Sequence, residues 1–499
     1  MKRGLYLAAV ATLTIAVFGT RPTVQAATSS YNWTQFNFDS HHSGNDPQEK
    51  VISPSTVSSL HRLFQVSLPA VADSTPVYLS NVSTSSGMRD LVYVTTTDGH
   101  IVALDAHTGA QIWSQQYGPG SCRINNNSGP CYTTSSPAIS PGLRYVYSYG
   151  LDGYVHRYLV GSGTEMKGGG WPELATAKPY DEKGSSALSI AATGSGQFLY
   201  VANGGYPGDY GDYQGHITAI NLSRGTQQVF NTLCSNQAVH FMETPATPDC
   251  PSKQSAVWAR PGVIYDSTTG KLYFATGNGD FNPAVHDWGD SVLALKPNGT
   301  GVNGNPVDSY TPTDYQQLQN TDADLGSTAP AILPPYRTSP QHVAVQGGKD
   351  ALLRLINLDT LSGQGGPGHT GGEIGSPISV PQGGEVLTQP AVWRNPANGS
   401  IWVFVANDQG ISGIRVVISG GKPTLQPTWT VHTGGTSPIV ANGVLFYASS
   451  GIIQALNPST GAQLWHDTTI GGIHWESPIV DNGRLYITDG NGLLTVYGL

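Results

Sequence analysis

Short apolar runs separated by turns recur along the chain. A typical unit contains the run Leu91–Val94, the turn Asp98-Gly99 and a second apolar run, Ile101–Leu104. Runs of this length that are bounded by turn-forming residues predict short β-strands joined by tight turns. The pattern therefore predicts an all-β fold.

A Ser/Thr-Pro step leads into an apolar strand at five places, and three looser copies bring the total to eight. Successive copies are 40 to 74 residues apart. The eight copies end at Pro76, Pro137, Ala187, Pro261, Pro330, Pro390, Pro438 and Pro478. Regular recurrence over this distance is typical of a repeat architecture.

A second repeated element follows the apolar strands. The segment Ala103–Trp113 returns almost unchanged as Ala455–Trp465, with a weaker copy at Ala219–Val229. Asp105 or Asn457 at the strand end is expected to hydrogen-bond the turn, and Thr-Gly forms the next bend. Each unit is then one four-stranded sheet that cannot bury both faces alone, so eight units predict a single eight-bladed β-propeller over residues 27–499.

The two ends of the repeat array are incomplete. The last unit ends at Leu494–Tyr497 and lacks an outer strand. The stretch His61–Val66 precedes the first unit and belongs to none of the eight units. We expect this early strand to complete the last blade and so to close the ring.

Composition agrees with many strands and turns. The chain has 62 Gly and 34 Pro among 499 residues, and only 11% of its residues are charged. These values exclude coiled coils and helical arrays, and 10 Trp, 24 Tyr and 11 Phe make disorder improbable. The net charge of -9 and the lack of any basic block argue against a nucleic-acid partner.

The N-terminus has the pattern of an exported protein. Lys2-Arg3 precede the apolar run Leu5–Phe18, and Val24–Ala26 follows a short polar stretch. This predicts a signal peptide over residues 1–26 and a secreted or extracytoplasmic protein with no membrane span after cleavage. An uncleaved anchor is the alternative, although the apolar run is short for a span.

Four cysteines fit an oxidising compartment. Three pairings are formally available, and we expect the two local ones, Cys122 with Cys131 and Cys234 with Cys250, because each closes one irregular loop. There is no CxxCH motif, which excludes a covalently attached c-type haem.

The segment Ala103–Trp113 resembles the repeat of the pyrroloquinoline quinone (PQQ) propeller proteins, and this likeness extends over nearly the whole mature chain. In the quinoprotein alcohol dehydrogenases of that family, PQQ stacks on a Trp and binds Ca²⁺ or a lanthanide, and an Asp takes the alcohol proton. The resemblance implies that Trp258 is the stacking floor. It also implies that Asn278, in Ala275–Gly279, is a metal ligand. A packing Trp and a simple Asn-Gly turn are the respective alternatives.

Two further segments resemble parts of the same site. Asn320–Gly326 is similar to the segment that holds the catalytic Asp, so the resemblance makes Asp322 the base and Asp324 the extra metal ligand of the lanthanide-using branch. Lys349 falls where the family places a cation on the quinone oxygens. A polar turn-forming loop and an ordinary surface lysine are the alternatives for these two segments.

The chain also departs from the family pattern. The metal-binding Glu of the family has no counterpart, and only Asp209 or Asp212 could replace it; we take Asp209 as the candidate ligand. The family's adjacent-cysteine disulfide is absent, because Cys122 and Cys131 are separated in sequence.

Two functional hypotheses follow. The first is a secreted quinoprotein oxidoreductase that oxidises an alcohol or sugar hydroxyl with PQQ, Ca²⁺ or a lanthanide ion, and an external electron acceptor. The second is a non-catalytic propeller that binds a protein, glycan or cell-wall partner. A propeller hydrolase or lyase is a weaker alternative, because no carboxylate pair for it is identifiable.

Overall fold

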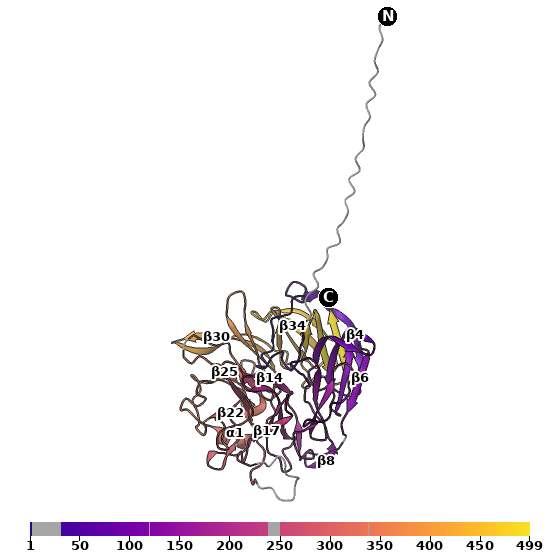
Figure 1. Cartoon of the computed structure of the whole chain (residues 1–499). Helices are drawn as coiled ribbons and strands as arrows, with labels where there is room; N and C mark the ends of the chain where they lie inside the picture. The colour runs from indigo at the N-terminus through magenta and orange to yellow at the C-terminus, as the bar shows by residue number, and fades with distance from the viewer. Residues whose placement is uncertain (2–30, 119, 238–249, 338) are drawn as a thin grey trace.

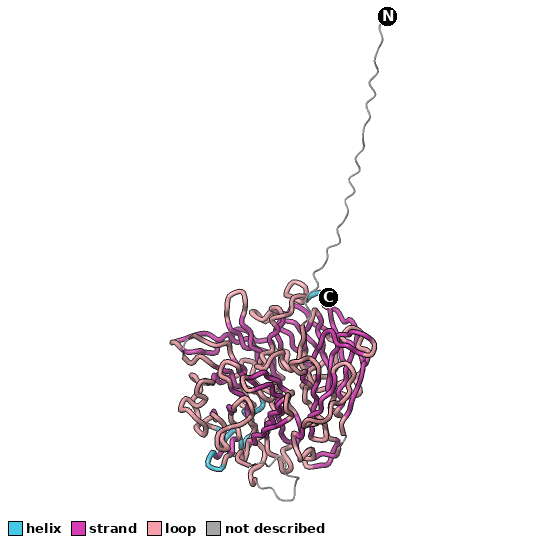
Figure 2. Tube along the Cα trace, viewed as in Figure 1, coloured by secondary structure: helices cyan, strands magenta, loops and turns pink. Residues whose placement is uncertain are grey.

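The computed structural model describes Met1 and residues 31–118, 120–237, 250–337 and 339–499. The predicted signal peptide and its cleavage after Ala26 fall outside these ranges, apart from Met1. Strands of successive sheets follow one another around the molecule (Figure 1), and strands and loops make up nearly all of it (Figure 2). The fold is an eight-bladed β-propeller, as the repeat predicts.

Each blade is an antiparallel sheet of at least four strands, and the first four blades are consecutive along the chain. Blade 1 comprises β3 (Val77–Thr84), β4 (Gly87–Thr95), β5 (His100–Asp105) and β6 (Gln111–Gln116). Blade 2 comprises β9 (Ala138–Ile139), β10 (Tyr145–Tyr149), β11 (Tyr154–Leu159) and β12 (Glu173–Leu174). Blade 3 comprises β13 (Glu182–Gly184), β14 (Ser189–Thr193), β15 (Gly196–Gly205), β16 (His216–Asn221) and β17 (Thr226–Asn231). Blade 4 comprises β18 (Ile264–Asp266), β19 (Lys271–Ala275), β22 (Val292–Leu295) and β23 (Asp308–Tyr310).

The other four blades follow the same order, and the last one is shared between the two ends of the chain. Blade 5 comprises β24 (Ala331–Ile332), β25 (Val343–Gln346), β26 (Leu352–Asn357) and β27 (Ile378–Ser379). Blade 6 comprises β28 (Ala391–Arg394), β29 (Ile401–Asn407), β30 (Gly410–Ser419) and β31 (Lys422–Val431). Blade 7 comprises β32 (Ile439–Ala441), β33 (Val444–Ser449), β34 (Ile452–Leu456) and β35 (Gln463–Asp467), with β1 (Asn45–Asp46) added in parallel to β32. Blade 8 comprises β36 (Ile479–Asp481), β37 (Arg484–Asp489), β38 (Leu493–Gly498) and β2 (His61–Ser67).

Short elements occupy the connections between strands. The hairpin strands are β7 (Ser121–Ile124), β8 (Asn127–Pro130), β20 (Phe281–Asn282) and β21 (Asp287–Trp288). The helical segments are α1 (Tyr315–Thr321) and the 3₁₀ turns η1 (Val57–Ser59), η3 (Pro283–Val285) and η4 (Leu325–Ser327). Within the described ranges, no helix has both the length and the apolar character needed to cross a membrane.

The repeated Ser/Thr-Pro steps mark where the blades begin. In every blade the first strand after the step starts within three residues of it, as β3 does after Pro76 and β28 after Pro390. The steps of neighbouring blades are hydrogen-bonded to each other, since the Thr75 N–H donates to Ser136 Oγ at 2.9 Å. The Gln389 N–H donates in the same way to Ser437 Oγ at 2.9 Å. These hydroxyl groups satisfy buried backbone donors between blades, which explains why Ser recurs at this position.

The ring closes as predicted. Strand β2 pairs antiparallel with β38, with Arg62 opposite Tyr497 and Ser67 opposite Leu493. The indole N–H of Trp465 donates to the Leu60 carbonyl at 2.9 Å, which joins blade 7 to the closing strand. An N-terminal strand therefore supplies the missing fourth strand of blade 8.

The turns of the second repeat also form as predicted. Asp105 Oδ1 accepts the N–H of Thr108 at 3.0 Å, and Asn457 Oδ1 accepts the N–H of Ser459 at 2.9 Å. The Trp113 indole N–H donates to the Val160 carbonyl of the next blade at 2.8 Å. The repeat thus combines a side-chain-stabilised turn with an aromatic contact between blades.

Both expected disulfides are present, and the described residues hold no free cysteine. The Cys122–Cys131 bond closes the β7–β8 hairpin and is buried against Leu151 and Tyr206. The Cys234–Cys250 bond fastens the loop between β17 and β18.

Candidate functional site

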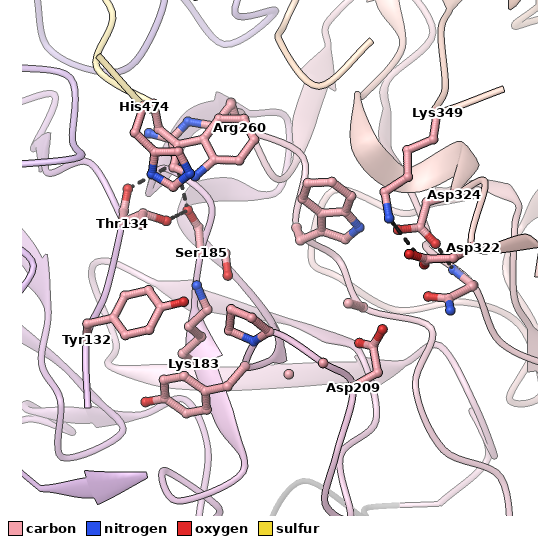
Figure 3. A pocket seen from close by; sticks show the side chains of 18 residues that line it. Tyr132, Thr134, Lys183, Ser185, Asp209, Arg260, Asp322, Asp324, Lys349 and His474 are labelled. Atoms are coloured by element: carbon pink, nitrogen blue, oxygen red, sulfur yellow. Dashed lines mark hydrogen bonds and ion pairs between the residues drawn. The ribbon is translucent and has the colours of Figure 1, made fainter. Parts of the chain in front are cut away.

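One cavity of about 310 Å³ lies where the beginnings of several blades meet (Figure 3). It is lined by all six residues that the sequence singled out for a site: Asp209, Trp258, Asn278, Asp322, Asp324 and Lys349. They come from blades 3, 4 and 5, so the fold brings together segments that are as much as 140 residues apart in the chain.

An acidic pair and a lysine form one wall of this cavity. Lys349 Nζ lies 2.8 Å from Asp324 Oδ2 and 3.2 Å from Asp322 Oδ1. The backbone N–H of Asn278 donates to Asp324 Oδ1 at 2.7 Å. The two carboxylates therefore converge on one point, as Figure 3 shows.

Close packing of two loops places these groups. Asp322 follows α1 in a left-handed conformation with φ 55°, and Asp324 leads into η4. A Cβ atom on Gly326 would lie 2.3 Å from the Gly277 nitrogen, so the η4 loop approaches the loop after β19 more closely than any side chain permits. This contact sets Asp324 beside Asn278.

The electrostatics of this wall are dominated by burial. Burial raises the pKa of Asp324, and the charge of Lys349 acts against that rise. Asp290 lies behind the wall and accepts the Leu325 N–H at 3.1 Å, while its Oδ2 has no partner among the described residues. Burial, opposed by the Leu325 hydrogen bond and assisted by the charge of Asp324, raises the pKa of Asp290 to about 8. Asp322 and Asp324 thus share one lysine, and Asp290 adds a third carboxyl group behind them.

Trp258 contributes the aromatic surface of the cavity. Lys349 Nζ lies 5.3 Å from its ring centroid, and Trp475 meets it edge-on at a centroid distance of 6.5 Å. Gly277 packs near the Trp258 Nε1 atom. The indole is therefore held between the acidic wall and Trp475.

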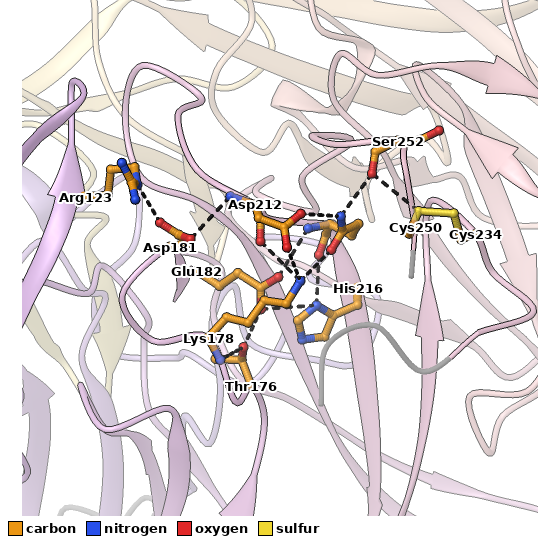
Figure 4. Close-up of polar contacts among 11 residues, drawn as sticks. Arg123, Thr176, Lys178, Asp181, Glu182, Asp212, His216, Cys234, Cys250 and Ser252 are labelled. Carbon is orange, nitrogen blue, oxygen red and sulfur yellow. Dashed lines mark hydrogen bonds and ion pairs between the residues drawn. A yellow bond between two sulfur atoms is a disulfide. The ribbon is translucent and has the colours of Figure 1, made fainter. Parts of the chain in front are cut away.

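The two candidates for the missing Glu lie in different places. Asp209 lines the cavity, and its Oδ1 accepts the Tyr213 hydroxyl at 2.5 Å. Asp212 points into the protein instead, where Lys178 Nζ lies 3.4 Å from its Oδ2 and Gln214 Nε2 donates to its Oδ1 at 3.2 Å (Figure 4). Only Asp209 is therefore placed to reach a ligand in the cavity.

Arg260 organises the other side of the cavity and was not among the predicted site residues. Its guanidinium donates to the carbonyls of Thr134 at 3.1 Å, Ser185 at 3.0 Å and Asp73 at 3.1 Å. Thr134 and Asp73 precede the first strands of blades 2 and 1, and Ser185 lies between β13 and β14 of blade 3, so one side chain connects four blades. Burial lowers the pKa of Arg260 to about 10, against the opposing charge of Asp73.

Further lining residues were also missed. His474 Nδ1 lies 2.9 Å from Asp73 Oδ2, and Lys183 enters the cavity from β13. The sequence carried a signal for two of these residues. Arg260 lies inside a repeat step, at a position where Ser or Thr is usual, and Lys183 lies two residues before the repeat step that begins at Ser185. The Asp73–His474 contact spans 401 residues and had no such signal.

The fold and the cavity define a single eight-bladed β-propeller with a charged, aromatic pocket between its blades. The chain belongs to the PQQ propeller family, because the family model described as "Glucose/ethanol/alcohol dehydrogenase, beta-propeller domain" matches residues 33–296. A search of curated proteins found no match to this sequence.

Solved structures share the fold at low sequence identity. The quinohemoprotein alcohol dehydrogenase from Comamonas testosteroni is 16% identical with a TM-score of 0.63, over 95% of this chain and 81% of that chain. A quinohemoprotein alcohol dehydrogenase from Pseudomonas putida HK5 is 16% identical with a TM-score of 0.62, over 94% and 80% of the two chains. A europium-containing methanol dehydrogenase is 14% identical with a TM-score of 0.62, over 94% and 98%. At this identity the likeness concerns the fold alone.

Proposed function

We propose that this protein is a quinoprotein dehydrogenase that oxidises an alcohol or sugar hydroxyl, with PQQ and a Ca²⁺ or lanthanide ion in the cavity. The observation that carries the proposal is the convergence of Asp322 and Asp324 on one point beside Trp258. The two disulfides fit an oxidising compartment, so we place the protein outside the cytoplasm.

The donor set suits a hard cation. Asp322 and Asp324 share one lysine, and behind them the buried Oδ2 of Asp290 has no partner among the described residues. Carboxylate and amide oxygens are the ligands that Ca²⁺ and similar ions prefer. Asp324, Asn278 and Asp209 would hold the ion, and Trp258 would present its ring to the cofactor.

When bound, PQQ supplies the acceptor for two electrons and the metal supplies a Lewis acid. The protein's own contribution would begin with Asp322, whose side chain is 65% exposed and is therefore accessible to a small hydroxyl compound. Its carboxylate would take the proton of the substrate hydroxyl. Lys349, 3.2 Å away, would keep that carboxylate oriented.

A non-catalytic binding propeller is the competing hypothesis. Lys349 already forms ion pairs with both Asp322 and Asp324, so this wall holds a cation of its own without a metal ion. Asp209 is shorter than the Glu of the family pattern, and one of its oxygens is bound to Tyr213.

Reconstitution separates the two hypotheses. Purified cofactor-free protein would be incubated with PQQ plus Ca²⁺ or La³⁺, and bound PQQ and dye-linked oxidation of alcohols and sugars would be measured. We expect the Asp322→Asn variant to keep PQQ uptake but to lose at least about 100-fold in kcat, because positioned general bases contribute about 10²–10⁴-fold. Asp280→Asn, an exposed carboxylate outside the cavity, is the matched control. Lack of both PQQ uptake and turnover with every metal would refute the proposal.

A further inference from the structure

Lys183 lines the same cavity and has no role in the proposed oxidation. In Figure 3 it lies well apart from Lys349 and the acidic pair. We propose that Lys183 is a reactive amine that binds small aldehydes or ketones covalently, as an imine, inside the cavity. This site is distinct from the metal and base positions above.

The strand that carries Lys183 is held firmly from behind. Side chains of β13 alternate, and the neighbouring Glu182 points into the protein, where it accepts the Thr176 hydroxyl and the Gln214 N–H (Figure 4). The β13 backbone pairs with β15, with Lys183 opposite Gly204. The alternation therefore directs Lys183 to the cavity side, where it is only 7% exposed.

The amine has no acceptor in the described part of the chain. Its Nζ lies 4.4 Å from the ring centroid of Tyr132 and 5.9 Å from that of Tyr206, and it makes no hydrogen bond or ion pair with a described residue. The two comparable lysines differ: Lys178 Nζ donates to Gln214 Oε1 at 2.8 Å, and Lys349 lies between two carboxylates. The two rings attract an ammonium group, but by less than the cost of burying that group without an acceptor, so Lys183 is suited to be neutral.

The charges around Lys183 favour the same state. Burial, followed by the positive charge of Arg260, lowers the pKa of Lys183 to about 7, and the charge of Asp73 acts against this. The rings that face it belong to Tyr132 and Tyr206, and burial raises the pKa of both, so they carry no charge near neutral pH. A buried lysine near another cation is activated as a nucleophile.

The reaction with a carbonyl compound balances without any further reagent. The Nζ lone pair attacks the carbonyl carbon, the C=O π electrons move to oxygen, and that oxygen takes a proton from the nitrogen. The resulting carbinolamine loses water, and the C=N bond of the imine forms. The cavity volume of about 310 Å³ restricts the partner to a small molecule. Aldehydes are what oxidation of a primary alcohol yields, but imine formation needs neither PQQ nor a metal.

Reductive trapping tests the proposal on cofactor-free protein. Folded protein would be treated with acetaldehyde and cyanoborohydride between pH 5.5 and 9, and peptide mass spectrometry would give an ethylation rate for each lysine. With its pKa lowered to about 7, Lys183 should be about half free amine at pH 7, against roughly 0.1% or less for an ordinary lysine. We expect Lys183 to react at least tenfold faster than the exposed Lys50 and Lys422, with a midpoint near pH 7.

The controls make either outcome decisive. Lys349 and Lys178, which have oxygen partners, should react slowly at pH 7, and Lys183→Met should remove the fast label while Lys422→Met retains it. Labelling of Lys183 no faster than that of Lys50, or without a rise near pH 7, would overturn the proposal. The measurement uses wild-type protein without PQQ, so its result is independent of the dehydrogenase proposal.

Discussion

Replacing Glu476 by Gln should change how the stability of the propeller depends on pH. Glu476 lies in the repeat step before blade 8, and it is fully buried. One oxygen accepts the His474 N–H at 2.6 Å, and the other has no partner among the described residues. Glutamine has nearly the same shape but does not titrate, so the variant isolates the effect of the charge.

The magnitude follows from proton linkage. Burial, and then the charge of Asp73, raises the pKa of Glu476 from 4.5 to about 8, while Arg260 acts against the rise. The folded protein therefore holds this proton more tightly than the unfolded chain. That contribution is fully present below pH 4.5 and is lost as the pH rises toward 8. At about 1.4 kcal/mol per pH unit, the loss is at most about 5 kcal/mol.

Urea unfolding at pH 5, 6.5 and 8.5, followed by Trp fluorescence, measures this loss. Relative to wild type, we expect Glu476→Gln to gain about 2–5 kcal/mol in unfolding free energy between pH 5 and pH 8.5. Asp73, His474 and Arg260 are present in both proteins, so the two proteins differ only in the side chain at position 476. Glu385→Gln, at an exposed position, should follow the wild-type pH dependence. Parallel pH profiles for wild type and Glu476→Gln would refute this argument.

Two other predictions concern the connections between blades. Arg260→Met leaves three buried carbonyls without their donor and should lower the unfolding free energy by about 3–6 kcal/mol in urea titrations; a loss below about 1 kcal/mol would contradict the linking role. Removing residues 27–70 takes away β2, leaves one edge of β38 without its partner strand and opens the ring, so the product should be unfolded by circular dichroism. A folded, monomeric product would show that the closing strand is dispensable.

The fold was predictable because its determinants are local and repeated. Steps such as Thr75-Pro76 form hydrogen bonds that recur from blade to blade. Each single step is a weak indication of a blade, but the repetition along the chain makes the propeller recognisable. The closing strand was predictable for a related reason. The last unit lacks one strand and the N-terminal region has one extra strand, so pairing the two completes the last blade.

The site was only partly predictable. Residues in recognisable segments, such as Asp324 and Asn278, were found together in the cavity. The choice between Asp209 and Asp212 could not be made from the sequence, because both lie in one glycine-rich turn and only the position of Lys178 separates them. Lys183 was missed because its environment is assembled from Tyr132, Tyr206 and Arg260, which no local pattern connects.

The distribution of charge explains why this cavity, more than any single residue in it, indicates function. Charged residues make up 11% of the chain, yet six of the 18 residues that line the cavity are Asp, Lys or Arg. Burying such groups is costly, and a closed ring of apolar blades gains no stability from a charged axis. Arg260 is explained by the backbone carbonyls that it joins, and Lys349 by its carboxylates. Lys183 has no hydrogen-bond or ion-pair partner in the described part of the chain, and the proposed small-molecule ligand would give a physical reason to keep it in the cavity.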